Sequence, residues 1–380
     1  MLHQPTSLRT GIGACRRLFA ATAIKFDLSR PNFPPSASPS AAPSNFSHAA
    51  TASKILAMQL QHQQQRQRVQ ASAQAVPVSF AHSLPPVIEA IASKCSQRGD
   101  AAVIELPCSS DIFDAIAQSP LKISTLGAGP DWHVGSSVRH VAQAAAGRTS
   151  LIVLQSVNAA TGMARPANFF ASLLRELDLL RPSRPPLLLV DDSYSAHCDA
   201  WADDSAGRDN VAFVADMGAA MGAPGRCCII RGQDPVLHSA AVNHPLQPSS
   251  LAVLDRRFAV PSAASTDLLR KNTAMFRAWM QRESGRLCWS DTGLTSSCAP
   301  VFVSIAPGVE LDSRRFYAEL ERRGSTRVGR GSEWAVDDSS FRIILGNVDT
   351  DVLQQGLQAI STALDIWAST DSNLGLGTIY

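Results

Sequence analysis

Residues 187–194 read Leu-Leu-Leu-Val-Asp-Asp-Ser-Tyr, an apolar run that ends abruptly in two acids. Short apolar runs bounded by turn residues are typical of strands buried on both faces of a parallel sheet. The chain has further runs of this kind at residues 101–106, 151–154, 211–214 and 227–230. Their recurrence predicts a sheet covered on both sides, with the two acids at the end of one of its strands.

Helical segments alternate with these strands. Residues 168–180 carry apolar side chains at helical spacing behind Asn168, a residue type that caps helix N-termini. Alternation of strands and helices favours a mostly parallel sheet with helices on both faces. The predicted fold class is therefore α/β, with a large domain of mostly parallel sheet flanked by helices and a small C-terminal α/β domain. The elements expected after the large domain are a helix at 266–283, strand 301–305, helix 312–323, strand 341–345 and helix 350–367.

The composition narrows the class of protein. The chain has 380 residues, of which 45% are hydrophobic and 17% charged, and a net charge of +2, as in soluble globular proteins of two domains. The charge is spread along the chain, so we expect no nucleic acid partner. No apolar stretch reaches the roughly 20 residues of a membrane-spanning helix, so we expect no membrane partner. The eight cysteines include no C-x-x-C spacing, which favours reduced thiols and no metal site.

The N-terminal part differs in composition from the rest. Residues 1–30 hold five Lys or Arg residues and a single acid, a composition typical of a mitochondrial transit peptide. A disordered basic tail on a cytoplasmic protein is the alternative. Residues 31–77, rich in Pro, Ser and Gln, predict a disordered linker. We assign residues 78–262 to the large domain, 263–283 to a linking helix and 284–380 to the small domain.

Five segments carry distinctive residue patterns. They are Gly-Asp, strand and Glu-x-Pro at 98–107, a loop with Asn and Thr-Gly at 155–162, the strand with Asp-Asp-Ser-Tyr at 190–194, a glycine loop at 215–225 and a strand with a central Arg at 340–345. In this order they resemble segments of the pyridoxal-phosphate (PLP) transferases of fold type I, the class I/II aminotransferases and α-oxoamine synthases. The third is similar to the family's Asp-Glu-Ala-Tyr, and the fourth to its Ser-x-Ser-Lys-x-x-Gly-x-x-Gly loop.

The resemblance implies roles for five residues. Asp191 would pair with the pyridinium nitrogen of PLP, because a carboxylate there keeps the nitrogen protonated and lets the ring act as an electron sink. Tyr194 would contact the ring, and Asn158 and Gly222 would also bind the cofactor. Arg342 would clamp the carboxylate of a small amino or keto acid, a task that suits a bidentate guanidinium. On the residues alone, an Asp at a strand end also caps turns.

The chain departs from the family at its Schiff-base lysine, whose position is occupied by Ala219. The lysine holds the cofactor's aldehyde and is regenerated in each turnover, and none of the chain's five lysines lies in a strand-end glycine loop. Ser109 stands where an aromatic or His residue stacks on the ring. Ala159 replaces an Asn that bonds the ring's phenolic oxygen, and Asp216 replaces a phosphate-binding hydroxyl. We therefore predict no catalytic residue, and PLP held non-covalently at best.

Three functions follow from this partial match. The first is a pseudo-enzyme that keeps the fold and works as a homodimer or as a heterodimer with a catalytic relative. The second is an active aminotransferase, or an acyl-CoA:amino-acid C-acyltransferase, that anchors its cofactor differently. The third is a binding module on the same fold without PLP. We favour the first, because catalysis by this route needs the lysine and folding does not.

Overall fold

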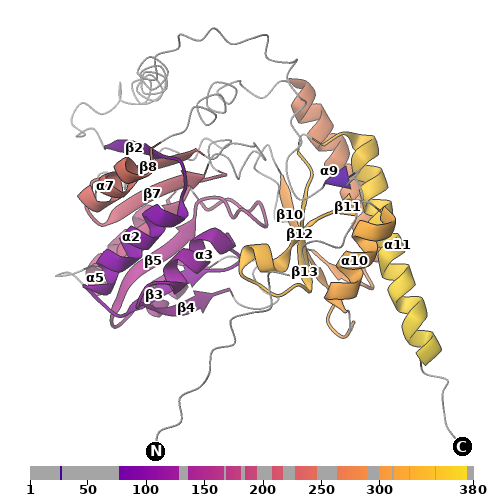
Figure 1. Cartoon of the computed structure of the whole chain (residues 1–380), viewed down its shortest axis with the longest axis horizontal. Coiled ribbons are helices and arrows are strands. Elements are labelled where there is room, and N and C mark those ends of the chain that lie inside the picture. Colours follow the sequence, from indigo (N-terminus) through magenta and orange to yellow (C-terminus); the bar gives the residue numbers. More distant parts are fainter. Residues whose placement is uncertain are drawn as a thin grey trace, which may run out of the picture.

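The computed structural model places two domains side by side (Figure 1). A large α/β domain holds the first half of the described chain, and a smaller domain holds the C-terminal part. The residues described are 26–27, 77–127, 136–166, 168–180, 185–194, 208–216, 227–245, 263–289, 299–309, 312–324, 326–346 and 348–374.

A seven-stranded sheet forms the centre of the large domain. Five neighbouring strands are parallel, and β8 runs antiparallel to both of its neighbours. The strands β5, β6 and β7 are buried along their whole length, as their continuous apolar sequences require. In spatial order the strands are β2 (Val78–Ala81), β8 (Cys228–Gly232), β7 (Val211–Asp216), β6 (Leu187–Asp191), β5 (Thr149–Gln155), β3 (Ala101–Glu105) and β4 (Lys122–Leu126).

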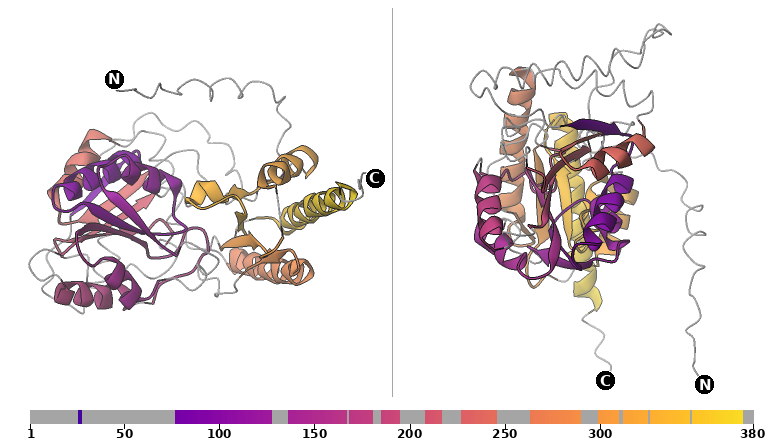
Figure 2. Two further views of the ribbon diagram at one scale, coloured as in Figure 1. Left: turned by 90° about the horizontal axis from the view of Figure 1, so that it is seen from below. Right: turned by 90° about the vertical axis from the view of Figure 1, so that its left-hand side faces the viewer.

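Helices cover both faces of this sheet, as Figure 2 shows in the view from below. One face packs against α2, α3 and α7, and the opposite face packs against α4 and α5. Both faces are therefore screened from water, and only the strand ends offer room for polar side chains. The helices are α2 (Pro85–Ser96), α3 (Ser110–Ala117), α4 (Val138–Ala144), α5 (Phe169–Leu180) and α7 (Pro235–Asn243).

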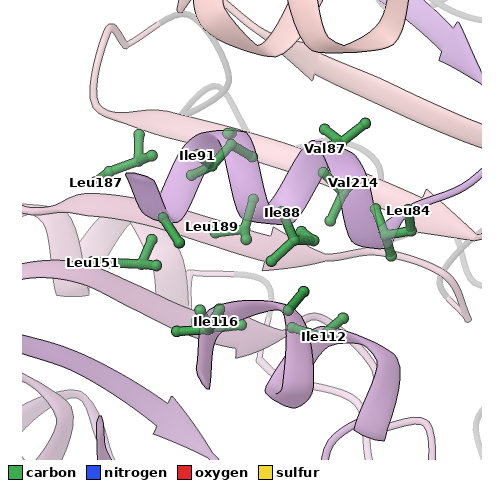
Figure 3. Close-up of a cluster of buried hydrophobic side chains, with 14 of the residues drawn as sticks. Leu84, Val87, Ile88, Ile91, Ile112, Ile116, Leu151, Leu187, Leu189 and Val214 are labelled. Atoms are coloured by element: carbon green, nitrogen blue, oxygen red, sulfur yellow. The ribbon is translucent and has the colours of Figure 1, made fainter. Parts of the chain in front are cut away.

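The packing of α2 illustrates how sequence spacing builds the core (Figure 3). Pro85 opens this helix, where its missing N–H costs no hydrogen bond. Val87, Ile88 and Ile91 share one face of the helix at a spacing of three to four residues and are at most 2% exposed. They lie against strand residues such as Leu189. Each such side chain stabilises the fold by about 1.5–3 kcal/mol.

The small domain consists of a four-stranded antiparallel sheet and three long helices. Its core joins Phe276 and Trp279 of the first helix, Phe316 of the second, Phe341 of the sheet and Leu357 of the last helix, all at most 2% exposed. The sheet order is β12 (Gly329–Arg330), β13 (Ser340–Ile344), β10 (Pro300–Ile305) and β9 (Leu287–Cys288), and the helices are α9 (Ala263–Glu283), α10 (Ser313–Gly324) and α11 (Thr350–Leu374).

A segment from the N-terminal region joins this domain. The strand β1 (Phe26–Asp27) pairs in parallel with β11 (Thr326–Arg327). The pair lies beside α11. These two residues fall within the segment 1–30 for which we predicted a transit peptide. Cleavage C-terminal to this point would remove a strand from the small domain.

The predicted fold class is confirmed, because the strands and helices appear in the expected order. The antiparallel direction of β8 and the edge strand β2 were not expected. The domain limits at 262 and 283 stay predictions, and residues 246–262 lie outside the described part. Among the described helices, none combines the length and apolar character that crossing a membrane requires.

Candidate functional site at the carboxyl ends of the strands

Four neighbouring parallel strands end in buried polar residues. Glu105 ends β3, Gln155 ends β5, Asp191 ends β6 and Asp216 ends β7, and each is at most 5% exposed. Gln155 and Asp191 are direct cross-strand partners. Ligands of open parallel sheets bind at this edge, so these residues define the candidate site.

The carboxyl group of Asp191 has a perturbed pKa. Burial raises its pKa to about 6, while hydrogen bonds from the Ser193 side chain and backbone oppose the shift, and the charges of Asp192 and Asp216 add to it. The Ser193 hydroxyl donates to Asp191 Oδ1 over 2.5 Å, and the Ser193 amide donates to the same oxygen over 3.0 Å. At pH 7 Asp191 is therefore largely ionised although it is buried.

Two serines tie the acids of neighbouring strands together. The Ser193 hydroxyl accepts a hydrogen bond of 2.8 Å from the Asp216 amide, so the end of β6 is linked to the end of β7. The Ser156 hydroxyl donates to Asp192 Oδ1, which links the residue after β5 to the residue after β6. The sequence interpretation did not identify either serine, because a buried Ser has no spacing signal of its own.

A buried ion pair closes one side of the site. Arg165 donates to Glu105 Oε2 through Nη2, and their side chains are 8% and 5% exposed. The same guanidinium donates to the carbonyls of Ser136 (3.0 Å) and Gln155 (3.1 Å) and lies over the Phe169 ring. The pair therefore fixes the loop that follows β5, and nothing in the sequence pattern indicated it.

Asn158, predicted to bind the cofactor, holds this loop through both ends of its amide. Its Nδ2 donates to Pro107 O over 3.1 Å, and its Oδ1 accepts from the amides of Ala160 and Thr161 over 3.0 Å each. Gln155 Nε2 donates to the same Pro107 carbonyl over 2.7 Å. The cofactor role of Asn158 stays a prediction, and its observed contacts are those of a loop anchor.

Tyr194 and Arg342 meet where the two domains join. Arg342 Nη1 donates to the Tyr194 hydroxyl over 2.8 Å and to the Ala159 carbonyl over 3.0 Å. The guanidinium carbon lies 4.0 Å from the centre of the Trp334 ring, and Tyr194 and Arg342 are 2% and 4% exposed. The structure thus brings two of the predicted site residues together, while a substrate role for Arg342 remains a prediction.

Cys108 is a buried thiol that is influenced by the charges of Asp191 and Glu105. Burial raises the pKa of the Cys108 thiol far above its ordinary value, and the charges of Asp191 and Glu105 raise it further. The thiol therefore stays protonated and does not act as a nucleophile, which requires the thiolate. Within the described ranges, no cluster of three or more His, Cys, Asp or Glu residues is arranged to hold a metal ion.

The described lysines lie away from Asp191. Lys94 forms an ion pair of 2.6 Å with Asp234. Lys122 is exposed at the start of β4, whereas Asp191 lies at the end of the parallel strand β6. Lys271 is exposed on α9 of the small domain. Lys25 and Lys54 fall outside the described residues, as do Ala219 and Gly222.

Solved structures of PLP-dependent enzymes share this fold. A PLP-bound C-S lyase from Staphylococcus hominis matches with a TM-score of 0.60 and 14% identity, over 76% of this chain and 73% of the lyase. A methionine aminotransferase from Escherichia coli matches with a TM-score of 0.58 and 14% identity, over 75% of this chain and 77% of the aminotransferase. A PLP-dependent aminotransferase from Streptococcus suis matches with a TM-score of 0.57 and 12% identity, over 91% of this chain and 94% of that enzyme. The sequence alone matches no family model and no curated protein significantly.

This chain therefore has the fold of the class I/II aminotransferases, fold type I of the PLP-dependent enzymes. The described residues suit one end of that cofactor. Both described hydrogen bonds to the Asp191 carboxylate go to Oδ1, so Oδ2 is available to accept from a protonated ring nitrogen. Of the glycine loop predicted at 215–225, residues 217–225 lie outside the described part.

Proposed function

We propose that this chain is a pseudo-enzyme that has the aminotransferase fold and does not form the lysine-linked cofactor adduct on which aminotransferase chemistry depends. The supporting observation is the distribution of lysines. The sequence has Ala219 at the predicted lysine position, and the three described lysines lie at an ion pair with Asp234, at the far edge of the sheet and on α9. An imine requires a primary amine at the aldehyde.

The retained residues would still support non-covalent binding of PLP. Asp191 would accept a hydrogen bond from the ring nitrogen, and this contact would favour the ionised carboxylate. Arg342, whose Nη1 donates to Tyr194 and Ala159, would be the guanidinium that binds the carboxylate of a small amino or keto acid. When bound, PLP supplies an electron sink, and the missing element is an amine to hold and release it.

The first test is a reduction experiment with the whole chain. Purified protein is mixed with PLP, its absorbance is recorded between about 330 and 430 nm, and borohydride, which reduces only a covalent Schiff base, is added before peptide mass mapping. We expect no PLP-modified lysine, because Ala219 occupies the predicted lysine position and none of the three described lysines lies at the site. An aminotransferase that keeps its lysine is the positive control. A stoichiometric adduct on one lysine would contradict the proposal.

A second test restores the missing amine. We expect Ala219→Lys to gain a borohydride-trapped adduct at most and no transamination, because three further predicted cofactor contacts stay altered at Ser109, Ala159 and Asp216. The measurement combines mass mapping with half-reactions of a panel of amino acids, followed by absorbance. Turnover by the single variant would mean that these positions are compatible with catalysis.

The main alternative is an active aminotransferase, or an acyl-CoA:amino-acid C-acyltransferase, with altered cofactor anchoring. The observation that favours it is the buried Asp191 carboxylate at the end of β6, which is suited to a pyridinium. In this case the reduction experiment would identify a lysine outside the described ranges, Lys25 or Lys54. Complete absence of PLP binding would instead favour a binding module on the same fold.

Partner and location follow the same proposal. A chain without its own catalytic amine would act as a homodimer or beside a catalytic relative, and native mass of the protein isolated from cells distinguishes the two. For residues 1–30 we propose mitochondrial import from their composition. The mature N-terminal residue tests this, and retention of Phe26–Asp27 would keep the pairing with β11.

A further inference from the structure

Ser193 is a departure from the family segment that the strand β6 resembles. That segment reads Asp-Glu-Ala-Tyr, and this chain has Asp-Asp-Ser-Tyr at 191–194. An alanine has no side-chain hydrogen bond to offer, whereas Ser193 makes two. The side chain is 5% exposed, so its hydroxyl is bound to protein groups in a site largely closed to water.

The two hydrogen bonds fix the direction of the Ser193 hydroxyl. The Asp216 amide donates to the hydroxyl oxygen over 2.8 Å. The single hydroxyl proton therefore points to Asp191 Oδ1, 2.5 Å away, and cannot serve another acceptor. The Ser193 amide donates to the same oxygen over 3.0 Å. Two donors thus hold Oδ1 of the Asp191 carboxylate. Because the carboxylate is planar, holding Oδ1 also restricts the direction in which Oδ2 points.

We propose that Ser193 is a positioning residue for Asp191, which holds one oxygen of this carboxylate, aims the other at a protonated ring nitrogen and ties both to the backbone at Asp216. The last contact matters because Asp216 belongs to the glycine loop predicted at 215–225, three residues before Ala219. The inference rests on the proposed PLP role of Asp191 and adds a residue that the family segment lacks.

The charges around Asp191 explain why a donor is needed. Asp192 on the same strand end and Asp216 on β7 both raise the pKa of Asp191, in addition to burial. The charge of Asp191 raises the pKa of the Cys108 thiol, which follows β3, so this thiol stays protonated. Among the described residues, the charged groups that act on Asp191 are acidic, and the Ser193 hydroxyl donates a hydrogen bond that stabilises its ionised form.

The first experiment needs no cofactor. The native pKa of Asp191, about 6, lies above its ordinary value of 3.8. The stabilising contribution of Asp191 to the free energy of unfolding is therefore fully present below pH 3.8, and it is lost as the pH rises through about 6. Ser193→Ala removes a donor and raises this pKa, so its destabilisation should grow between pH 5 and pH 8. Thermal unfolding across this range measures the effect.

Matched variants separate positioning from ordinary packing. Ser150→Ala removes another buried hydroxyl, which donates to the neutral Ala101 carbonyl, so its effect should not change with pH. In an Asp191→Asn background Ser193→Ala should also lose its pH dependence. Ser193→Thr keeps the hydroxyl and should restore the wild-type profile. If Ser193→Ala does not fold, Ser193→Cys, which offers a weaker donor, provides the same comparison.

The second experiment measures PLP binding by absorbance at pH 7. A rise of one unit in the pKa of Asp191 from about 6 lowers its ionised fraction at pH 7 by about twofold, and we expect Ser193→Ala to weaken PLP binding by at least about this factor, with Ser193→Thr near wild type. If the unfolding profiles behave as expected and neither protein binds PLP, the cofactor proposal fails together with the contact to a ring nitrogen, and only the role of Ser193 in holding the Asp191 carboxylate stands. A Ser193→Ala effect that is independent of pH, or unchanged in the Asp191→Asn background, would overturn the inference.

Discussion

Replacing Arg165 by Ala is expected to lower the free energy of unfolding by about 3–5 kcal/mol. The substitution leaves the Glu105 carboxylate, 5% exposed, without its cation. It also removes the donors to Ser136 O and Gln155 O and the contact with the Phe169 ring. Urea unfolding followed by tryptophan fluorescence gives the change in free energy.

The matched control for this prediction is an exposed pair of the same type. Arg148 lies 3.4 Å from Asp100, with side chains 79% and 42% exposed. Solvent screens such a pair, so Arg148→Ala should cost at most about 1 kcal/mol. Equal losses for the two variants would show that burial of the Arg165–Glu105 pair has no special weight.

The second large effect is expected at Arg342. Arg342→Ala should lower the free energy of unfolding by about 3 kcal/mol, because a hydrogen bond to a charged group contributes about 1.5–3 kcal/mol and Arg342 makes two across the domain junction. Its stacking on Trp334 is lost as well. The measurement is again urea unfolding, with limited proteolysis to detect separation of the domains.

Arg330 provides the comparison within the same small sheet. It also lies over an aromatic ring, that of Tyr317, and pairs with Glu321 over 2.9 Å, but its side chain is 40% exposed. Arg330→Ala should therefore have a small effect and leave the protease pattern unchanged. If Arg342→Ala behaves in the same way, Arg342 does not hold the two domains together.

The agreement between sequence and structure is strongest for the interior strands. The runs at 151–154, 187–190 and 211–214 are apolar throughout, and such runs are stable only when both sheet faces are covered. The acids and the amide at their ends were also recognisable, because residues that follow parallel strands meet at one edge. The short edge strand β2 had no comparable pattern, and its pairing with β8 depends on the sheet being assembled.

The candidate site could be predicted only in part, because many of its contacts join segments that are distant in the sequence. Asp191, Tyr194 and Arg342 could be selected from their segments, but their partners could not. Arg342 and Tyr194 are 148 positions apart in sequence, and Arg165 and Glu105 are 60 apart. No local pattern encodes such pairs, since they exist only after strands from distant segments have become neighbours.

The amino-acid sequence by itself determined that this chain has buried parallel strands, two α/β units and an alanine at the predicted lysine position. These properties depend on the polarity and identity of residues close together in the chain. Only the tertiary structure decided that Ser193 holds Asp191 and that Arg342 joins the two domains. A buried polar group must find a hydrogen-bond partner, and which partner it finds is set by the packing of the whole sheet against the small domain.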